Sequence, residues 1–110
     1  MTAIQVVVTY GAPPDPAAFL ERYASVHVPL VEQIPGLARF AWGTVERAPE
    51  ESNLPYLVAE LTFDSRQAMS DGMGGDHGRA AAADGANFSI KPSMAYRVEL
   101  LGQFNGPDRR

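Results

Sequence analysis

The sequence predicts an α+β fold in which one antiparallel sheet carries helices on a single face. Four segments are rich in β-branched and aromatic residues, which is typical of strands. Two other regions space apolar residues three and four positions apart, which is typical of helices. Along the 110 residues the order is strand, helix, strand, strand, helix, strand. This βαββαβ order is the ferredoxin-like arrangement, with a four-stranded antiparallel sheet.

The expected strands lie at residues 4–10, 37–45, 56–63 and 94–100. The first is β-branched almost throughout, and the second alternates so that Phe40 and Trp42 share one face. A polar stretch that ends at a proline, residues 47–55, predicts a loop between the second and third strands. Residues 105–110 are expected to form a polar tail, so the domain should span residues 1–104.

The first helix is expected to begin with Asp15 as its N-cap and Pro16 in its first position. Pro29 offers no N–H and crowds the preceding turn, so the helix should kink or end near His27. A short second helix would then begin around Pro29. The inward face of this region is predicted from the helical spacing to consist of Phe19, Tyr23, Val26, His27 and Leu30.

The second helical region is expected to begin at a cap formed by Asp64 or Ser65 and to continue through Met69. It should loosen at the glycine-rich residues 72–75. An alanine-rich helical piece would follow at residues 79–84, with His77 in a loop between the two. Asp84 is expected to cap a helix or to face solvent, although orienting a histidine is an alternative.

The composition excludes several classes of protein. The formal net charge is −4 and there is no basic run, so we expect no nucleic-acid binding. The absence of cysteine excludes disulfides, thiolate metal sites and a cysteine nucleophile. No leader-like segment opens the chain, and no apolar stretch approaches about 18 residues. We therefore expect no membrane association and a cytoplasmic location.

Apolar residues occur on both faces of the expected strands. A sheet covered by helices on one side only should be polar on its other side. An uncovered apolar face would be too large for a stable monomer, which predicts a homodimer formed through this sheet face. The adjacent pairs that carry this argument are Val6 and Val7, Phe40 and Ala41, and Leu57 and Val58.

The first half of the chain also resembles a known family. The motifs are residues 15–19 (DPAAF), Tyr23, residues 27–30 (HVPL) and residues 34–37 (IPGL). Together they resemble the signature of EthD-domain proteins, which belong to the dimeric α+β barrel superfamily. Residues 58–65 and 84–88 extend the resemblance into the second half, whereas residues 72–77 depart from it.

The resemblance implies a dimeric α+β barrel and several kinds of activity. The protein that names the family is tied to alkyl-ether degradation, where its role is accessory. Some similar proteins act as dehydratases, cyclases or decarboxylases on aromatic polyketides. Related barrels include cofactor-free monooxygenases. Because one barrel serves many reactions, the fold by itself does not identify the activity.

His27 is the main candidate for a catalytic residue. Its reference pKa near neutrality suits proton transfer, and the resemblance favours a role in ligand chemistry. The alternative is a core histidine bonded to a backbone carbonyl that Pro29 leaves unpaired. Tyr23, one turn earlier, would orient His27 or the substrate, although a helical tyrosine at this spacing is also a common core residue.

Four aromatic residues are candidates for substrate binding. Trp42, together with Phe40, either walls a pocket for an aromatic ring or fills the sheet face at the dimer interface, and we favour the second. Tyr10, at the end of the first strand, presents the same pair of alternatives. The full set of expected substrate-binding residues is Phe19, Trp42, Tyr10 and Phe88.

No metal and no other cofactor is expected. His77 and Asp76 would need His27 to form a site of two histidines and a carboxylate, and no His-x-x-x-His motif supports one. Residues 72–75 do not follow a strand and lack a phosphate-loop lysine.

We therefore expect a cofactor-independent enzyme that acts by proton transfer on a hydrophobic, aromatic or polyketide-like small molecule, as a dehydratase, isomerase or cyclase does. The alternatives are a cofactor-free monooxygenase, a non-catalytic ligand-binding or accessory protein of an oxidative degradation pathway, and a dimer with a solidly packed interior. An open pocket of about 300 Å³ or more at His27 would favour ligand handling.

Overall fold

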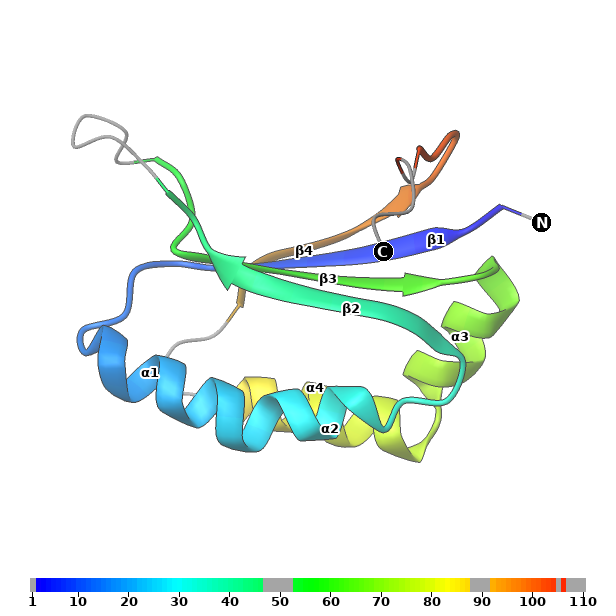
Figure 1. Ribbon diagram of the computed structural model, residues 1–110. Helices are drawn as coiled ribbons and strands as arrows, with labels where there is room; N and C mark the ends of the chain where they lie inside the picture. Colours follow the sequence, from blue (N-terminus) through cyan, green and yellow to red (C-terminus); the bar gives the residue numbers. More distant parts are fainter. Residues whose placement is uncertain (1, 47–52, 88–91, 105, 107–110) are drawn as a thin grey trace.

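The computed structural model describes residues 2–46, 53–87, 92–104 and 106. Over this part of the chain, four strands form one antiparallel sheet in the order β2-β3-β1-β4. All helices lie on one face of the sheet (Figure 1). The predicted α+β, ferredoxin-like architecture is confirmed. The strands are β1 (Ile4–Tyr10), β2 (Leu37–Thr44), β3 (Leu57–Phe63) and β4 (Pro92–Glu99).

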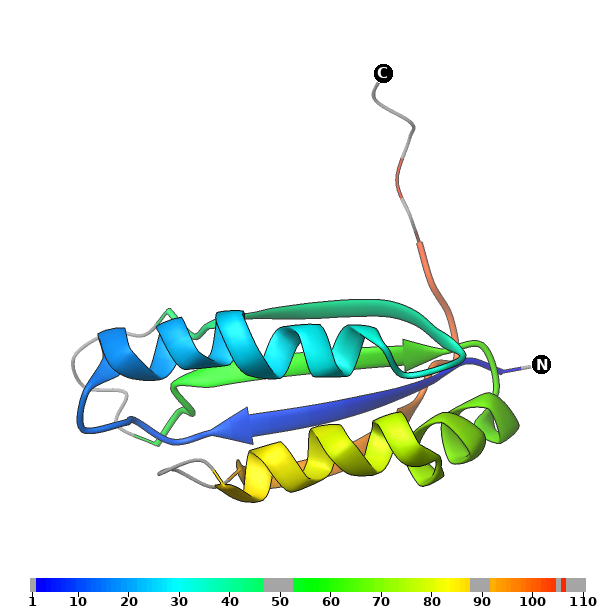
Figure 2. The same ribbon diagram turned by 90° about the horizontal axis from the view of Figure 1, so that it is seen from below.

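The helical layer is built from two arms. The first consists of α1 (Pro16–Arg22), the π-helical segment η1 (Tyr23–His27) and α2 (Val28–Glu32). The second consists of α3 (Arg66–Gly74) and α4 (Asp76–Asn87). The two arms run side by side beneath the sheet, as Figure 2 shows from the helical side. No helix of the described residues is long and apolar enough to cross a membrane.

Side-chain caps begin two of these helices, as the sequence predicted. The N–H of Ala18 donates to Asp15 Oδ1 at 3.2 Å, and Pro16 occupies the first turn of α1. The N–H of Ala68 donates to Ser65 Oγ at 3.0 Å at the start of α3. Each cap satisfies a backbone donor that would otherwise lack an intrahelical partner.

The first helical arm changes at His27 as predicted, since η1 ends there and α2 begins at Val28 with Pro29 in its first turn, but the expected break in the helical backbone does not occur. It continues through Pro29 to Glu32, and the backbone at His27 and Val28 stays in the right-handed helical region. The reason is a wider turn. The N–H of Val28 donates to the carbonyl of Tyr23, five residues earlier, where an α-helix would use the residue four earlier.

The wide turn also moves the inward face of the helix by one residue. His27, Val31 and Ile34 are buried, whereas Val26 is 41% exposed. The inward assignment of Val26 was therefore wrong, because it assumed 3.6 residues per turn throughout. The assignment of His27 to the inward face agrees with the structure.

The second helical arm is more regular than the sequence suggested. His77 is not in a loop but in the first turn of α4, because α3 and α4 are separated only at Gly75. Gly72 is buried against the turn between α2 and β2. A Cβ at this position would lie 2.5 Å from the carbonyl oxygen of Pro35. Glycine therefore permits α3 to approach this turn closely.

The core lies between the helices and the sheet. Among the described residues it contains two clusters. The larger cluster is aliphatic and surrounds Phe63, which is fully buried. The smaller one is mainly aromatic and consists of Tyr10, Phe19, Tyr23 and Leu57.

The face of the sheet without helices is mixed in character. Alternation places Val7, Val58 and Val98 there, but also polar residues such as Gln5 and Thr62, which are joined by a hydrogen bond of 3.3 Å. The expectation of a wholly apolar face was therefore wrong. Phe40 and Trp42 lie on the helix side of the sheet instead: Phe40 lines the pocket there, and the ring centroid of Trp42 lies 5.2 Å from that of Tyr23. Neither residue can therefore take part in an interface through the helix-free face. Most of the predicted loop at 47–55 and most of the tail at 105–110 lie outside the described residues.

Candidate functional site

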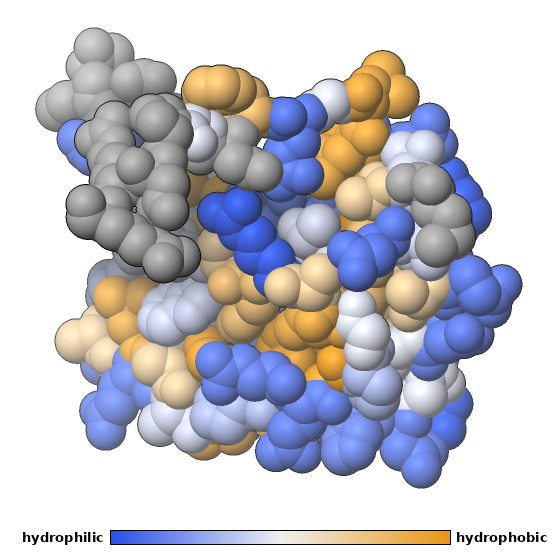
Figure 3. All heavy atoms as spheres, turned by 45° about the vertical axis from the view of Figure 1, so that its right-hand side comes forward, coloured by the Kyte–Doolittle hydropathy of each residue, from blue (hydrophilic) through white to orange (hydrophobic). Residues whose placement is uncertain are grey.

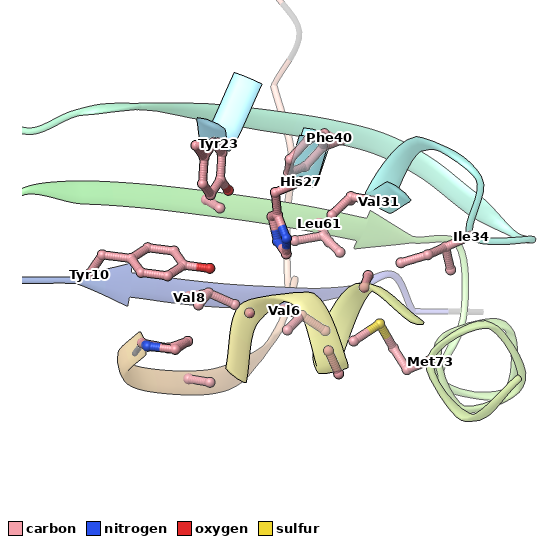
Figure 4. A pocket seen from close by; sticks show the side chains of 16 residues that line it. Val6, Val8, Tyr10, Tyr23, His27, Val31, Ile34, Phe40, Leu61 and Met73 are labelled. Carbon is pink, nitrogen blue, oxygen red and sulfur yellow. The ribbon is translucent and has the colours of Figure 1, made fainter. Parts of the chain in front are cut away.

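A pocket of about 240 Å³ lies between the helices and the sheet. Most of its walls are apolar side chains from both layers, among them Val6, Val8, Phe40, Leu61 and Met73 (Figure 4). Figure 3 shows apolar side chains gathered at the centre of one side of the molecule, between the level of the sheet and that of the helices, with hydrophilic side chains around them. The interior between the layers is therefore not packed solid.

His27 brings a titratable group to this pocket. Its side chain ends η1, lines the pocket and is 7% exposed as a residue. Its Nδ1 atom lies 2.9 Å from Oδ2 of Asp84, which comes from α4, 57 positions later in the chain. An imidazole nitrogen at this distance from an ionised carboxylate carries a hydrogen and donates a hydrogen bond to it, which leaves Nε2 as the nitrogen that can accept a proton.

Arg22 binds the same carboxylate from the surface side. Its guanidinium donates to Oδ1 of Asp84 at 2.9 Å and to Oδ2 at 3.4 Å. Desolvation acts to raise the pKa of Asp84, but hydrogen bonds from Arg22 and His27 and their charges outweigh it and lower that pKa. Asp84 is therefore a carboxylate at neutral pH and can hold the Nδ1–H form of His27.

Two tyrosines supply the other polar groups of the pocket. Burial, followed by the charge of Asp84, raises the pKa of Tyr10 to about 12. Burial and the neighbouring Tyr10 also raise the pKa of Tyr23. Both hydroxyls are thus neutral at physiological pH and can donate hydrogen bonds. The ring of Tyr23 lies 5.0 Å from that of His27, and the Tyr10 hydroxyl points into the space beside His27 (Figure 4).

The structure brings together three of the predicted site residues, His27, Tyr23 and Tyr10, which all line the pocket. Phe19 does not line it but packs behind the two tyrosines, with its ring centroid 5.7 Å from that of Tyr10. Trp42 packs against Tyr23 and is 39% exposed. Phe88 lies outside the described residues.

Asp84 and Arg22 are the residues that sequence reasoning missed. Asp84 neither caps a helix nor faces solvent, since its side chain is only 10% exposed. Arg22 lies outside the inward stripe that regular helical spacing predicts, so the sequence gives no signal for its contact with Asp84. The contact between Asp84 and His27 was anticipated from the sequence only in the alternative role given to Asp84, which was to orient a histidine. No group of three or more potential metal-ligating side chains occurs among residues 2–46, 53–87 and 92–104.

Comparison with known proteins places this chain in a family. The EthD domain matches residues 12–91 of the chain. The chain belongs to the EthD-domain family. A curated relative is an uncharacterized 11.0 kDa protein from the thcB-thcC intergenic region of Rhodococcus erythropolis. It is 42% identical over 85 residues, which cover 77% of this chain and 82% of the relative.

Solved structures agree with this membership. An EthD family protein from Bacillus halodurans has a TM-score of 0.78 and 26% identity, covering 92% of this EthD-family chain and 100% of its own. A dimeric ferredoxin-like protein of unknown function from Thermobifida fusca has a TM-score of 0.67 and 16% identity, over 90% and 92% of the two chains. The second likeness shows the shared fold alone.

Proposed function

We propose that this EthD-family protein is a small cofactor-independent enzyme that transfers a proton on an apolar, ring-containing molecule. One observation carries the proposal: a histidine held at 2.9 Å by a carboxylate that is only 10% exposed lines an apolar pocket. Positioned general acid–base groups accelerate proton transfer by roughly 10²–10⁴-fold. Dehydration, isomerisation and cyclisation all begin or end with such a transfer.

Each group at the site has a role in this proposal. Nε2 of His27 removes a proton from a carbon next to a carbonyl; the electron pair of the broken C–H bond forms a C=C bond, and the π pair of the carbonyl moves to its oxygen. Asp84 holds His27 through Nδ1 and stabilises the imidazolium that forms. In this proposal the neutral hydroxyls of Tyr10 and Tyr23 donate hydrogen bonds to the oxygen as its charge develops. Return of the proton to carbon or oxygen completes the step.

The pocket restricts the class of ligand. A cavity of 150 Å³ accommodates benzene, so about 240 Å³ suits one substituted ring or two fused rings. This volume is below the roughly 300 Å³ at which drug-sized pockets begin. A small ring compound with one oxygen near His27 therefore fits better than an extended polyketide chain.

A binding protein without turnover is the competing proposal. The same pocket would then hold an apolar molecule, and His27 would only donate or accept a hydrogen bond. A dimer with a solidly packed interior does not account for the pocket, although the pocket is smaller than the roughly 300 Å³ set above for ligand handling. Proton transfer and binding without turnover differ in one measurable property, which is whether His27 exchanges protons with the ligand.

Deuterium exchange from D₂O into 2-tetralone, a two-ring ketone with acidic C–H groups, measures this property without knowledge of the natural substrate. We expect the protein to accelerate exchange and His27→Gln to lower the rate by about 10²–10⁴-fold while 2-tetralone still binds. Asp84→Asn should also lower it, because an amide N–H facing Nδ1 imposes the wrong tautomer. His77→Gln, which alters an exposed histidine, is the control and should exchange normally. If His27→Gln exchanges deuterium at the wild-type rate, the enzyme proposal is refuted and binding without turnover is the function that remains.

We also propose that the protein is a homodimer paired through the helix-free sheet face. Met94 and Tyr96 are large apolar side chains exposed on this face. Leu101 and Phe104 follow β4 and are each 90% exposed, where a second copy could cover them. The Thermobifida fusca neighbour is described as dimeric.

Sedimentation velocity at micromolar concentration tests the dimer. Tyr96→Asp should convert it to a monomer, because a charge at a buried interface lacks compensation. Val26→Asp, at an exposed apolar position on the helical side, is the matched control and should remain dimeric. A wild-type protein that sediments as a monomer would contradict the proposal.

A further inference from the structure

Arg22 and His27 meet on one carboxylate although they lie five positions apart in the helix. In a regular α-helix, positions five apart differ in direction by about 140° around the axis. Yet Arg22 lies 2.9 Å from Oδ1 of Asp84 and His27 lies 2.9 Å from Oδ2. The local helix geometry must therefore bring the two side chains to the same side.

The wide turn of η1 has this effect. The N–H of Val28 donates to the carbonyl of Tyr23, so residues five apart lie above one another across this turn. The residues that are buried after the turn are His27, Val31 and Ile34. Their spacing fits a helix in which one extra residue has been inserted within the turn.

Pro29 accounts for the position of this turn. In a regular α-helix its N–H would donate to the carbonyl of Ser25, but proline has no N–H and its ring collides with that carbonyl. A turn with one extra residue removes the collision and keeps the helix continuous. In the structure η1 ends at His27, two residues before Pro29.

We propose that Pro29 is a positioning residue of the His27–Asp84 pair: it holds open the wide turn that lets Arg22 and His27 converge on Asp84. The catalytic meaning of this alignment rests on the proposed function, whereas the alignment itself does not. Without the proline, the helix gains a backbone hydrogen bond by closing to a regular α-helix. That closure rotates His27 away from Asp84 and turns Val26 towards the interior.

The test compares Pro29→Ala with Pro16→Ala, which removes a proline from the first turn of the same arm, where no internal hydrogen bond is affected. The readout is the ¹⁵N NMR signal of the His27 ring, which distinguishes a proton on Nδ1 from one on Nε2. The exposed His77 is the second of the two histidines in the chain and serves as an internal reference. We expect Pro29→Ala to lose the Nδ1–H signal of His27 and Pro16→Ala to keep it.

A rescue variant covers the case in which Pro29→Ala folds poorly. Deleting Val26 together with Pro29→Ala removes the extra residue, so a regular α-helix would again place Arg22 and His27 on one side, now four positions apart. This double variant should fold and recover the Nδ1–H signal. A Pro29→Ala protein that keeps the signal, or a folded double variant that lacks it, would overturn the proposal.

The tetralone assay separates this proposal from the proposed function. If Pro29→Ala loses the Nδ1–H signal while His27→Gln leaves deuterium exchange unchanged, the positioning role holds and the catalytic role fails. If His27→Gln abolishes exchange while Pro29→Ala keeps both the signal and the activity, the catalytic role of His27 holds and the positioning role of Pro29 fails.

Discussion

Replacing Asp84 by alanine removes the carboxylate that joins the two helical arms. The bond to His27 connects side chains that are 9% and 10% exposed, and hydrogen bonds to charged groups contribute about 1.5–3 kcal/mol. The contact with Arg22 involves a side chain that is 43% exposed, and such ion pairs contribute about 0–1 kcal/mol. We therefore expect Asp84→Ala to lower the free energy of unfolding by about 2–3 kcal/mol at neutral pH.

The loss should depend on pH in a defined direction. Desolvation opposes ionisation of Asp84, but Arg22 and His27 prevail and its folded-state pKa is lowered. A carboxyl group with a lowered folded-state pKa contributes stability that is fully present above its unfolded pKa, about 3.9, and is lost as pH falls through the folded value. The difference in stability between wild type and Asp84→Ala should therefore be full at neutral pH and shrink below about pH 4.

Urea unfolding followed by the fluorescence of Trp42, the single tryptophan, measures this difference. Protein concentration must be constant, because association contributes to apparent stability. Asp76→Ala is the matched control, since this aspartate on the same helix has a side chain that is 95% exposed and forms a surface ion pair with Arg79. It should change stability by less than about 1 kcal/mol at every pH. An Asp84→Ala protein as stable as wild type, or a difference that ignores pH, would refute the reasoning.

Three further changes have expected outcomes. Gly72→Ala should lower the free energy of unfolding in urea by about 1–3 kcal/mol, because its Cβ would meet a backbone carbonyl, whereas Gly74→Ala, with open space around it, should be neutral or stabilising by up to about 1 kcal/mol. Tyr10→Phe should remove one phenol that ionises near pH 12 from an ultraviolet titration, and an unchanged titration above pH 11 would contradict the raised pKa. Gly85→Leu extends towards Cε1 of His27, 3.9 Å from the new Cβ, and calorimetry should show about ten- to hundredfold weaker binding of 2-tetralone.

The architecture was predictable because it depends on short-range signals. Strand β1 is β-branched nearly throughout, and Asp15 and Ser65 act as local caps whose effect needs no tertiary information. The order of such elements was enough to predict the sheet. The end of β2 and the start of β3 were also predicted within a residue or two of their observed positions.

The candidate site was predictable only in part. His27 was assigned to the interior from helical spacing, but the partner that gives it a chemical role lies 57 positions away, and no local pattern indicates that Asp84 turns inward. The wide turn was missed because Pro29 was taken to break the helix, whereas an added residue lets the helix continue. That added residue determines which of Val26 and His27 faces inward and how His27 is placed relative to Arg22.

The pocket shares its walls with the layers that hold the fold together, since Val6, Val31 and Leu61 belong both to the core and to the lining. A molecule that enters it therefore binds the native protein and finds no equivalent site in the unfolded chain. At a concentration of 100 times Kd, such a molecule adds about 2.7 kcal/mol to the free energy of unfolding. The melting temperature can thus identify an occupant in a compound library before any reaction of that compound has been observed.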